Sequence, residues 1–498
     1  MYRCPNCGAN MAYDIKRKEL YCDYCDTGIK VDEHPKQQQD AKEATYDTTL
    51  YRCPQCGGEI TSTENAATEF CTYCGMTVVL DGHLSKEKKP DYIVPFQLTK
   101  EDCKNIYRKR THSVWCMPNE LKDENYLNRF IPIYMPYLVY HARQQGTDKF
   151  TGSNSHGKYE YRYEIDAIMD NEYDWMIHDA STKFYDELSD AICDYTMENS
   201  EDFKTGYLAG FYADNPDVEP STYVDETRKD IEDRAIIYLS QNVKDDRGSS
   251  ILGISKKNKT IFNGGEIDSK TALFPVWFLT WRHKDRVTYS VVNGETGSCE
   301  GDYPISMKKF LLFSLLFSIP FFLVFLFLPV FLPEMLLNAT LCFSMIILTI
   351  SGIVLTSQLN HDEHLKDKGV MSQKEDVKPY RIFVLFYTWP IVMAICTLVI
   401  GRYSFSIVAL VYTFFLSIKF CRLSKKKHDP SILLGLLFVP FAVIACAIQM
   451  WNPVSDMYHY TGIVAILIGT CLEFMFLIRR YNLSCSLPVP VYYERSSQ

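Results

Sequence analysis

The sequence predicts a multi-domain chain built from three kinds of structure. These are a tandem pair of small β modules rich in cysteine, a soluble α+β domain, and a C-terminal all-α transmembrane bundle of six helices. Two observations predict this division: eight of the 18 cysteines lie within the first 74 residues, and long apolar runs begin only after residue 306. A chain of 498 residues also exceeds the usual size of one domain.

Charge is distributed as unevenly as the apolar residues. Residues 307–498 contain 16 Lys and Arg and 10 Asp and Glu, a net charge of +6. Residues 1–306 therefore hold the other 36 basic and 51 acidic residues, a net charge of −15. An acidic polar part followed by an apolar, slightly basic part excludes a simple globular enzyme, a disordered chain and a strongly basic nucleic-acid-binding protein.

The N-terminal cysteines form two C-x-x-C sets with the same spacing. In each set 14 residues separate the two C-x-x-C pairs, and each cysteine of the second set follows its counterpart by 49 positions. Flanking residues repeat too, since Tyr24 in the first set matches Tyr73 in the second. The module is therefore an internal duplication. Its candidate metal ligands are Cys4, Cys7, Cys22 and Cys25 in the first copy and Cys53, Cys56, Cys71 and Cys74 in the second.

This spacing is typical of a zinc ribbon. A C-x-x-C turn points two thiolates at one ion, and two such turns supply four soft ligands in a tetrahedron, which suits Zn²⁺. The 14-residue insert is long enough for a β-hairpin. We expect two structural Zn²⁺ ions, each closed by protein ligands and each stabilising a module too small to fold alone. Iron held by four thiolates, or disulfides, would fit the same spacing.

Changes in composition give the expected boundaries. In the polar linker, His34 is expected to be a linker residue and not a further ligand, because each site already has four cysteines. The expected parts are ribbon 1 at 1–31, a linker at 32–47, ribbon 2 at 48–84, a cytoplasmic α+β domain at 91–306, the six-helix domain at 307–480 and a cytoplasmic tail at 481–498.

The α+β domain shows helix and strand patterns but no motif of a catalytic site. Thr99 and Asp102 resemble a capping box that opens a helix to about residue 110. Further helices are expected over 181–196 and 222–242, and strands over 130–141, 157–168 and 274–282. The domain contains no phosphate-binding loop, no H-E-x-x-H and no G-x-S-x-G motif. We therefore expect no enzyme, no catalytic residue and no small-molecule substrate.

The last third contains six apolar runs of nearly bilayer length, at 310–332, 335–356, 382–401, 403–420, 432–450 and 457–478. Lys and Arg gather on one side of these runs, which predicts a multi-pass protein of the plasma (inner) membrane with both termini in the cytoplasm. Glu473 is expected to pair locally with Arg480, although a proton relay remains an alternative. His361 and His364 are expected in a solvated loop, with a second metal site as the alternative.

The first residues, Met1-Tyr-Arg-Cys4, do not have the form of a secretory signal peptide. We therefore expect the cysteine-rich part in a reducing compartment, where thiols bind metal instead of forming disulfides. This expectation agrees with the side chosen by the basic residues.

Several segments resemble a known bacterial family. They are the Cys4-Pro-Asn-Cys7-Gly ribbon, Tyr92-Ile-Val-Pro-Phe, Ile133-Tyr-Met-Pro-Tyr-Leu, Gly206-Tyr-Leu-Ala-Gly-Phe-Tyr-Ala-Asp214, Phe274-Pro-Val-Trp-Phe-Leu-Thr and Val292-Asn-Gly-Glu-Thr-Gly. Over residues 1–306 the chain is similar to TFIIB-type zinc ribbon-containing proteins. The resemblance implies a zinc-bearing cytoplasmic region. Members are sometimes labelled replication-restart helicases, but this chain lacks the phosphate loop that a helicase needs.

These observations favour a non-enzymatic adaptor or scaffold. It would be anchored in the lipid bilayer and would bind a protein partner at the inner membrane face. One alternative is a transporter or membrane enzyme with a zinc-ribbon regulatory domain. Another is a membrane-tethered nucleic-acid-binding regulator, which the net charge of −15 in residues 1–306 disfavours.

Overall fold

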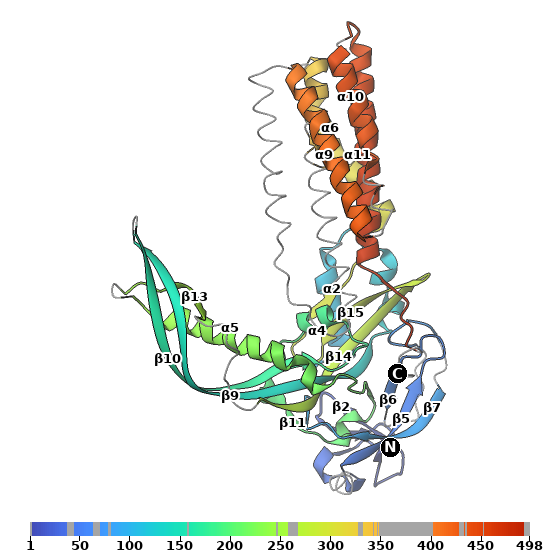
Figure 1. Ribbon diagram of the computed structural model, residues 1–498. Coiled ribbons are helices and arrows are strands. Elements are labelled where there is room, and N and C mark those ends of the chain that lie inside the picture. The colour runs from blue at the N-terminus through green and yellow to red at the C-terminus, as the bar shows by residue number, and fades with distance from the viewer. Residues whose placement is uncertain are drawn as a thin grey trace.

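A computed structural model of the chain shows a β-sheet body that carries a long hairpin arm and a group of helices (Figure 1). It describes residues 2–36, 44–62, 70–77, 81–156, 159–245, 248–256, 267–326, 332–341, 343–345, 347, 402–427, 433, 436–451 and 453–492. The N-terminus lies at the end of the body opposite the helices, while the C-terminus lies beside the body (Figure 1).

Ribbon 1 is a separate four-stranded antiparallel sheet. Its strands pair in the order β1-β2-β3-β4, and β2 and β3 form the expected hairpin between the two cysteine pairs. Its buried apolar side chains include Tyr2, Met11 and Leu20. Its elements are β1 (Tyr2–Arg3), β2 (Asn10–Asp14), β3 (Glu19–Cys22), β4 (Thr27–Ile29) and the 3-10 helix η1 (Val31–Glu33).

Ribbon 2 belongs to the main sheet instead. Within the described residues that sheet has 13 strands, with the path β11-β8-β14-β9-β12-β6-β5-β7 and five strands paired off this path. The strands are β5 (Thr45–Arg52), β6 (Glu59–Ser62), β7 (Asp81–Lys88), β8 (Tyr92–Ile93), β9 (Ile131–His156), β10 (Tyr159–Asp179), β11 (Glu201–Asp202), β12 (Tyr212–Ala213), β13 (Leu252–Lys256), β14 (Ile267–His283), β15 (Arg286–Asn293), β16 (Cys299–Gly301) and β17 (Leu487–Pro488). Since β5 begins at Thr45, the ribbon starts inside the segment expected to be linker.

Both faces of the central strands are buried: ribbon 1 packs on one face and the cysteine turns of ribbon 2 pack on the other. Side chains alternate along β14, so Leu273 and Trp277 join the core that includes ribbon 1, whereas Phe274 and Phe278 join the core that includes ribbon 2. The same alternation explains why β14 has an unbroken buried run. The cysteines of the two copies thus belong to cores on opposite faces of β14.

Short helices complete these cores. The expected capping box at Thr99 and Asp102 is present and opens α2, and the helix expected at 222–242 is α5. Only a short helix, α4, forms in the segment 181–196. The elements are α2 (Lys100–His112), η2 (Asn119–Lys122), α3 (Glu124–Leu127), α4 (Asp186–Ala191), η3 (Met197–Asn199), η4 (Thr205–Leu208), η5 (Pro220–Tyr223) and α5 (Val224–Asn242).

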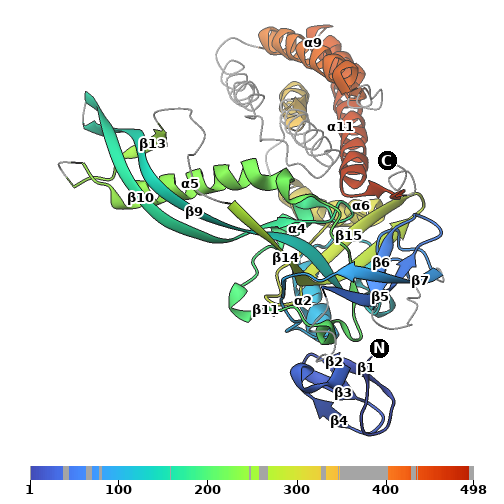
Figure 2. The same cartoon turned by 60° about the horizontal axis from the view of Figure 1, so that its bottom comes forward.

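The arm is an extension of β9 and β10 far beyond the body (Figures 1 and 2). These two strands pair from Tyr137 with Asp179 out to His156 with Tyr159. Strand β13 pairs with β9, and one face of the hairpin packs on α5 through a small apolar core that includes Phe150, Met169 and Leu239. The sequence predicted both strands, but not their length.

The helices after residue 306 correct a central expectation. Among the described residues one helix, α11, is long and apolar enough to cross a membrane, so the predicted six-helix transmembrane bundle over 307–480 is wrong. Apolar runs reveal hydrophobicity but not where a helix starts: Pro440 lies in the first turn of α10, which begins at Val439 although the run begins at 432. The run at 382–401 lies outside the described residues. The helices are α6 (Met307–Leu326), α9 (Arg402–Lys427), α10 (Val439–Trp451) and α11 (Asp456–Ser484).

The chain enters and leaves the helical region at neighbouring points. The Asn482 side chain accepts a hydrogen bond from the Ile305 N–H at 2.7 Å and donates one to the Ile305 carbonyl at 2.8 Å. After α11 the chain turns back to the body, where β17 pairs with β15. Arg286 holds this turn by donating to Ser486 Oγ at 2.7 Å and to the Leu483 carbonyl at 2.6 Å.

Candidate metal centres

The four cysteines of ribbon 1 lie together. Cys4 follows β1 and Cys22 ends β3, so the β-hairpin brings the two C-x-x-C turns side by side. The Sγ atoms of Cys4 and Cys25 are 3.5 Å apart, as are those of Cys7 and Cys22. All four Sγ atoms lie within 4.8 Å of one another, and the group could hold a metal ion.

Ribbon 2 repeats this arrangement in its own four cysteines. The Sγ atoms of Cys53 and Cys74 are 3.8 Å apart, and those of Cys56 and Cys71 are 3.7 Å apart. This group also lies within 4.8 Å and could hold a metal ion. The structure therefore brings all eight candidate ligands into the two groups that the spacing predicts.

The sulfur geometry fits a four-coordinate metal ion. In a tetrahedron with Zn–S bonds of about 2.3 Å, sulfur atoms lie about 3.8 Å apart. The four distances between 3.5 and 3.8 Å are close to this value. A disulfide needs about 2.0 Å, and all eight thiols are free. Each site is filled by four protein sulfurs, which leaves no ligand position for a water molecule or a substrate.

A tight backbone turn holds each pair of thiols. In ribbon 2 the N–H of Gly57 donates to the Cys53 carbonyl at 2.8 Å, and the N–H of Gly75 donates to the Cys71 carbonyl at 2.9 Å. These glycines have φ of 75° and 67°, and Gly8 in ribbon 1 has φ of 74°. Residues with a Cβ rarely adopt this conformation, which explains the glycine after the second cysteine in three of the four turns.

Crowding of the thiols perturbs their pKa values. In ribbon 2, hydrogen bonds from the neighbouring thiols, Cys56 first, lower the pKa of Cys53. Contacts of the same kind, with Cys53 first, raise the pKa of Cys71. In ribbon 1 the Thr27 hydroxyl lowers the pKa of Cys25 to about 6. A cation removes this conflict, because it stabilises all four thiolates at once.

The two sites differ sharply in exposure. Cys7 is exposed and Tyr24, between the second pair of cysteines, is 83% exposed. The matching residues of ribbon 2 are enclosed: Cys56 is fully buried and Tyr73 is 1% exposed. Figure 2 shows ribbon 1 projecting from the body, whereas β5–β7 of ribbon 2 lie within it. The duplication thus produces one open and one closed site.

Strands β14 and β15 and the C-terminal tail close the site of ribbon 2. The Tyr289 hydroxyl donates to the Tyr73 carbonyl at 2.5 Å, and the Thr280 hydroxyl donates to the Thr72 carbonyl. On another side Tyr492 of the tail packs edge-on against the Tyr73 ring, with ring centroids 5.7 Å apart. The sequence matches Tyr73 with Tyr24, but it carries no signal for these long-range contacts.

Ribbon 1 is attached to the body through β2 and the 3-10 helix η1. The Tyr13 ring packs edge-on against Tyr207 with centroids 5.1 Å apart, and the Tyr13 N–H donates to the Ala209 carbonyl at 2.9 Å. Lys204 forms an ion pair with Asp32 at 3.0 Å. These contacts leave Cys7 and Tyr24 of the cysteine turns exposed.

Residues 206–214, which we term the junction segment, connect both ribbons to the central sheet. Its strand β12 pairs with β6 of ribbon 2 and with β9. The hydroxyls of Ser62 and Thr61 donate to the carbonyls of Phe211 and Ala213 at 3.3 and 3.0 Å. The Tyr-Leu-Ala-Gly-Phe-Tyr-Ala-Asp run that resembles the bacterial family therefore has a structural role in this chain.

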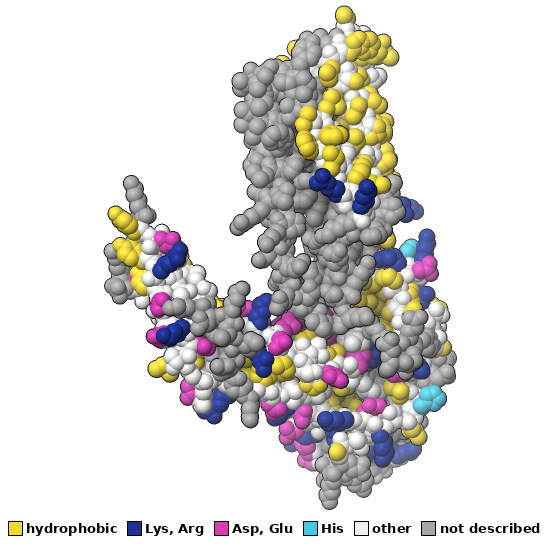
Figure 3. Space-filling model, in the orientation of Figure 1, with side chains coloured by type: hydrophobic (Ala, Val, Ile, Leu, Met, Phe, Trp, Pro, Cys, Tyr) yellow, Lys and Arg dark blue, Asp and Glu magenta, His cyan; other side chains and the backbone are white. Residues whose placement is uncertain are grey.

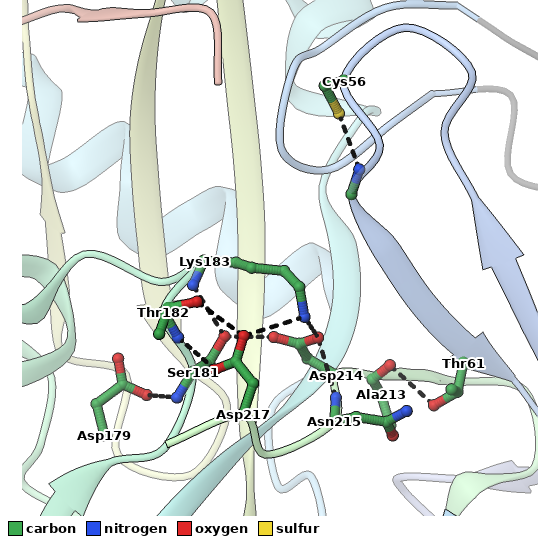
Figure 4. A network of polar contacts seen from close by, with 11 residues as sticks. Cys56, Thr61, Asp179, Ser181, Thr182, Lys183, Ala213, Asp214, Asn215 and Asp217 are labelled. Carbon is green, nitrogen blue, oxygen red and sulfur yellow. Dashed lines mark hydrogen bonds and ion pairs between the residues drawn. The ribbon is translucent and has the colours of Figure 1, made fainter. Parts of the chain in front are cut away.

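A buried polar network anchors the end of the junction segment (Figure 4). Lys183 Nζ lies 2.8 Å from a carboxylate oxygen of Asp214 and 3.8 Å from one of Asp217, and the Ser181 hydroxyl donates to Asp214. Burial raises the pKa of the neighbouring Asp179 well above its ordinary value. Because the ammonium is shared between two carboxylates, the network holds the loops together.

The Asn-Gly-Glu-Thr-Gly run is also structural. The Asn293 side chain accepts hydrogen bonds from the N–H groups of Glu295 and Thr296 at 2.8 and 3.1 Å, and donates to the Ile192 carbonyl at 2.8 Å. The Glu295 carboxylate accepts from the N–H and the hydroxyl of Thr196 at 3.0 and 2.6 Å. Both runs of the resemblance thus maintain the fold around the ribbons.

The remaining candidates lie elsewhere. His34 is buried against ribbon 1, with Nε2 3.0 Å from the Arg3 carbonyl, and is not part of either cysteine group. Glu473 and Arg480 are both buried on α11. His361 and His364 lie outside the described residues.

Comparison with known proteins gives one informative relative. No protein-family model matches the chain, and no solved structure matches it. It is 31% identical over 319 residues to the uncharacterised protein YdjG of Bacillus subtilis strain 168, an alignment that covers 62% of this chain and 91% of YdjG. The chain therefore belongs to the same family as YdjG.

Proposed function

We propose that the protein is a non-enzymatic adaptor, attached to the inner face of the bacterial plasma membrane, that binds a protein partner through ribbon 1. The observation that carries this proposal is the unequal exposure of the two cysteine sites. All four cysteines of ribbon 2 are buried, whereas Cys7 and Tyr24 in the cysteine turns of ribbon 1 are exposed. A ribbon that is fixed to the body and exposes part of its cysteine turns offers a surface that a partner protein can contact.

The metal sites support a structural role and not a catalytic one. Four sulfurs around one ion leave no position for substrate, which is typical of structural zinc. The donor set favours Zn²⁺, and the likeness to TFIIB-type zinc ribbon-containing proteins agrees with it. When bound, each ion would hold its two cysteine turns together, and the chain itself would supply the binding surface.

Attachment to a membrane is supported by the helical region. Hydrophobic side chains cover the described helices, while charged side chains gather over the body (Figure 3). Trp115 of the body is exposed and stacks on Phe317 of α6, with centroids 6.2 Å apart and an interplanar angle of 5°. Exposed Trp beside an apolar helix is typical of a membrane–water interface.

Contacts at the base of the helices support the same side for both termini. Because Ile305 and Asn482 are hydrogen-bonded to each other, the chain returns from the helices to the side from which it left. Lys308, Lys309, Arg479 and Arg480 lie near this point in the sequence. Basic residues at this end favour the cytoplasm for the body and tail.

Proximity labelling in intact cells tests the proposal. A biotin ligase fused to the N-terminus of the full-length protein would compare the wild type with Cys7→Ser/Cys25→Ser, and Cys116→Ser would be the control at a partly buried cysteine outside both sites. We expect at least one labelled protein to disappear only in the double variant. Identical labelled sets in all three proteins would contradict the proposal.

A second candidate function has one observation in its favour. Gln449, His459 and Glu473 are buried in the apolar helices α10 and α11, where polar groups often mark a transport path. Under this alternative the ribbons would regulate a transporter. Ion flux into proteoliposomes that is abolished by Glu473→Gln would favour it, and flux that is absent or independent of Glu473 would remove it.

A further inference from the structure

We propose that the cysteine turns of ribbon 1 bind an extended, basic segment of a partner protein that presents a tyrosine, as the turns of ribbon 2 bind the chain's own C-terminal tail. This inference rests on the proposed adaptor function and specifies the chemistry of the partner. Its basis is the internal duplication, since ribbon 2 shows what the same surface holds when it is occupied.

The tail binds ribbon 2 by one backbone bond and one aromatic contact. The N–H of Tyr492 donates to the Cys56 carbonyl at 2.7 Å. Its ring packs edge-on against Tyr73 at an interplanar angle of 70°. Gly58 makes room, because a Cβ there would lie 2.6 Å from the Tyr73 ring and 3.4 Å from the Tyr492 ring. This surface of ribbon 2 therefore binds an extended segment that presents a tyrosine ring.

Ribbon 2 also uses the carbonyls of its second cysteine turn. Thr72 and Tyr73 accept hydrogen bonds from the hydroxyls of Thr280 and Tyr289. Because both carbonyls already accept hydrogen bonds from the body, neither is left for an outside partner. The contacts consist of hydroxyl and N–H donors together with aromatic rings.

The matching groups of ribbon 1 are open. Cys7 corresponds to Cys56, and Tyr24 corresponds to Tyr73. Within the described part of the chain, no hydrogen bond reaches the carbonyls of Cys7, Asp23 and Tyr24. The tail cannot serve both sites at once, because Tyr492 already occupies ribbon 2. We therefore assign the exposed turns of ribbon 1 to a segment from another protein.

Two substitutions between the copies indicate the charge of that segment. Asp23 and Asp26 stand where ribbon 2 has Thr72 and Gly75. In ribbon 2 a Cβ at Gly75 would lie 3.3 Å from Cβ of Arg282, so an arginine already adjoins this turn. Carboxylates at the two exposed positions of ribbon 1 would attract Lys or Arg next to the tyrosine of the partner.

A peptide that copies the tail is the test probe. A fluorescent peptide of sequence Val-Pro-Val-Tyr-Tyr-Lys-Arg, which copies residues 489–495 with Lys in place of Glu494, is titrated against the full-length protein in detergent micelles. The affinity of the peptide is measured for the wild type, for Tyr24→Ala and for Tyr238→Ala. Tyr238 is an exposed tyrosine on α5 and serves as the control. Tyr24 is so exposed that its removal should leave the metal content and the melting temperature unchanged, which are measured on the same samples.

We expect Tyr24→Ala to weaken binding at least about tenfold, as loss of an aromatic anchor does, and Tyr238→Ala to leave it unchanged. A peptide with Glu in place of its Arg should bind more weakly. Absent binding to the wild type, or equal binding to Tyr24→Ala, would overturn the inference. The adaptor function would then still stand if Cys7→Ser/Cys25→Ser removes a labelled protein in cells, so the two failures are distinguishable.

Discussion

Ribbons 1 and 2 share their cysteine spacing, their turn geometry and a tyrosine in the second turn, yet they have opposite places in the molecule. Ribbon 2 contributes its strands to the main sheet and buries its four cysteines in the core. Ribbon 1 keeps its own sheet and exposes its turns. The difference shows that a metal-binding motif specifies a local fold. Contacts with the rest of the chain then determine whether the cysteine turns are buried in the core or exposed to a partner.

The largest expected effect is loss of a ligand in ribbon 2. Cys56→Ser removes a buried sulfur and the ion that it would hold, so we expect the free energy of unfolding to fall by more than about 5 kcal/mol, with the body no longer folding cooperatively. Cys7→Ser should lose one metal ion as well but leave the main melting transition in place. Thermal unfolding and metal content measure both effects. Equal destabilisation by the two variants would contradict the claim that ribbon 2, but not ribbon 1, is needed for the body to fold.

A smaller effect is expected at the buried network below the junction segment. Lys183→Ala leaves the carboxylate of Asp214 buried without its ammonium partner, and should cost about 4 kcal/mol. Lys183→Ala/Asp214→Ala should cost less than the sum of the single variants. Denaturant unfolding of the four proteins measures the coupling. Additive effects would show that the network does not act as a unit.

Weakening the attachment of ribbon 1 to the body should lower the stability by a smaller amount, and only in ribbon 1. Tyr207→Ala removes the ring that packs on Tyr13 and should weaken the attachment of ribbon 1 by about 3 kcal/mol. Because β12 and ribbon 2 keep their own contacts, only ribbon 1 should become sensitive to protease and to hydrogen exchange. Loss of protection in ribbon 2 to the same extent would contradict the independence of the two copies.

The smallest expected effect is on the pH dependence of the free energy of unfolding. It arises at His178, which lies outside both ribbons. Burial lowers the pKa of His178 to about 4, and its ring stacks on Tyr223 with centroids 4.8 Å apart. The unfolded chain therefore binds a proton more readily, so stability is lost as the pH falls from about 6.5 to about 4. His178→Gln should reduce this loss by about 1 kcal/mol, since the ring is partly exposed. An unchanged pH profile would contradict this role.

Local features were the most predictable from sequence. The cysteine spacing predicted the two groups of four thiols, and Thr99 with Asp102 predicted the start of α2. Both predictions succeed because turns and caps depend on neighbouring residues. Exposure was not predictable, since it depends on Tyr492, which lies more than 400 positions from ribbon 2. The six-helix bundle failed for a related reason: apolar run length says nothing of where a helix such as α10 begins.

The most direct measurement of the central claim is the rate of metal release from each ribbon. Purified full-length protein is mixed with excess chromogenic chelator, and the wild type is compared with Cys7→Ser/Cys25→Ser. We predict two phases of equal size, with ribbon 1 losing its ion at least about tenfold faster because its site is exposed; the fast phase alone should be missing in the variant. A single phase, or a fast phase that survives in the variant, would contradict the division into an open and an enclosed ribbon.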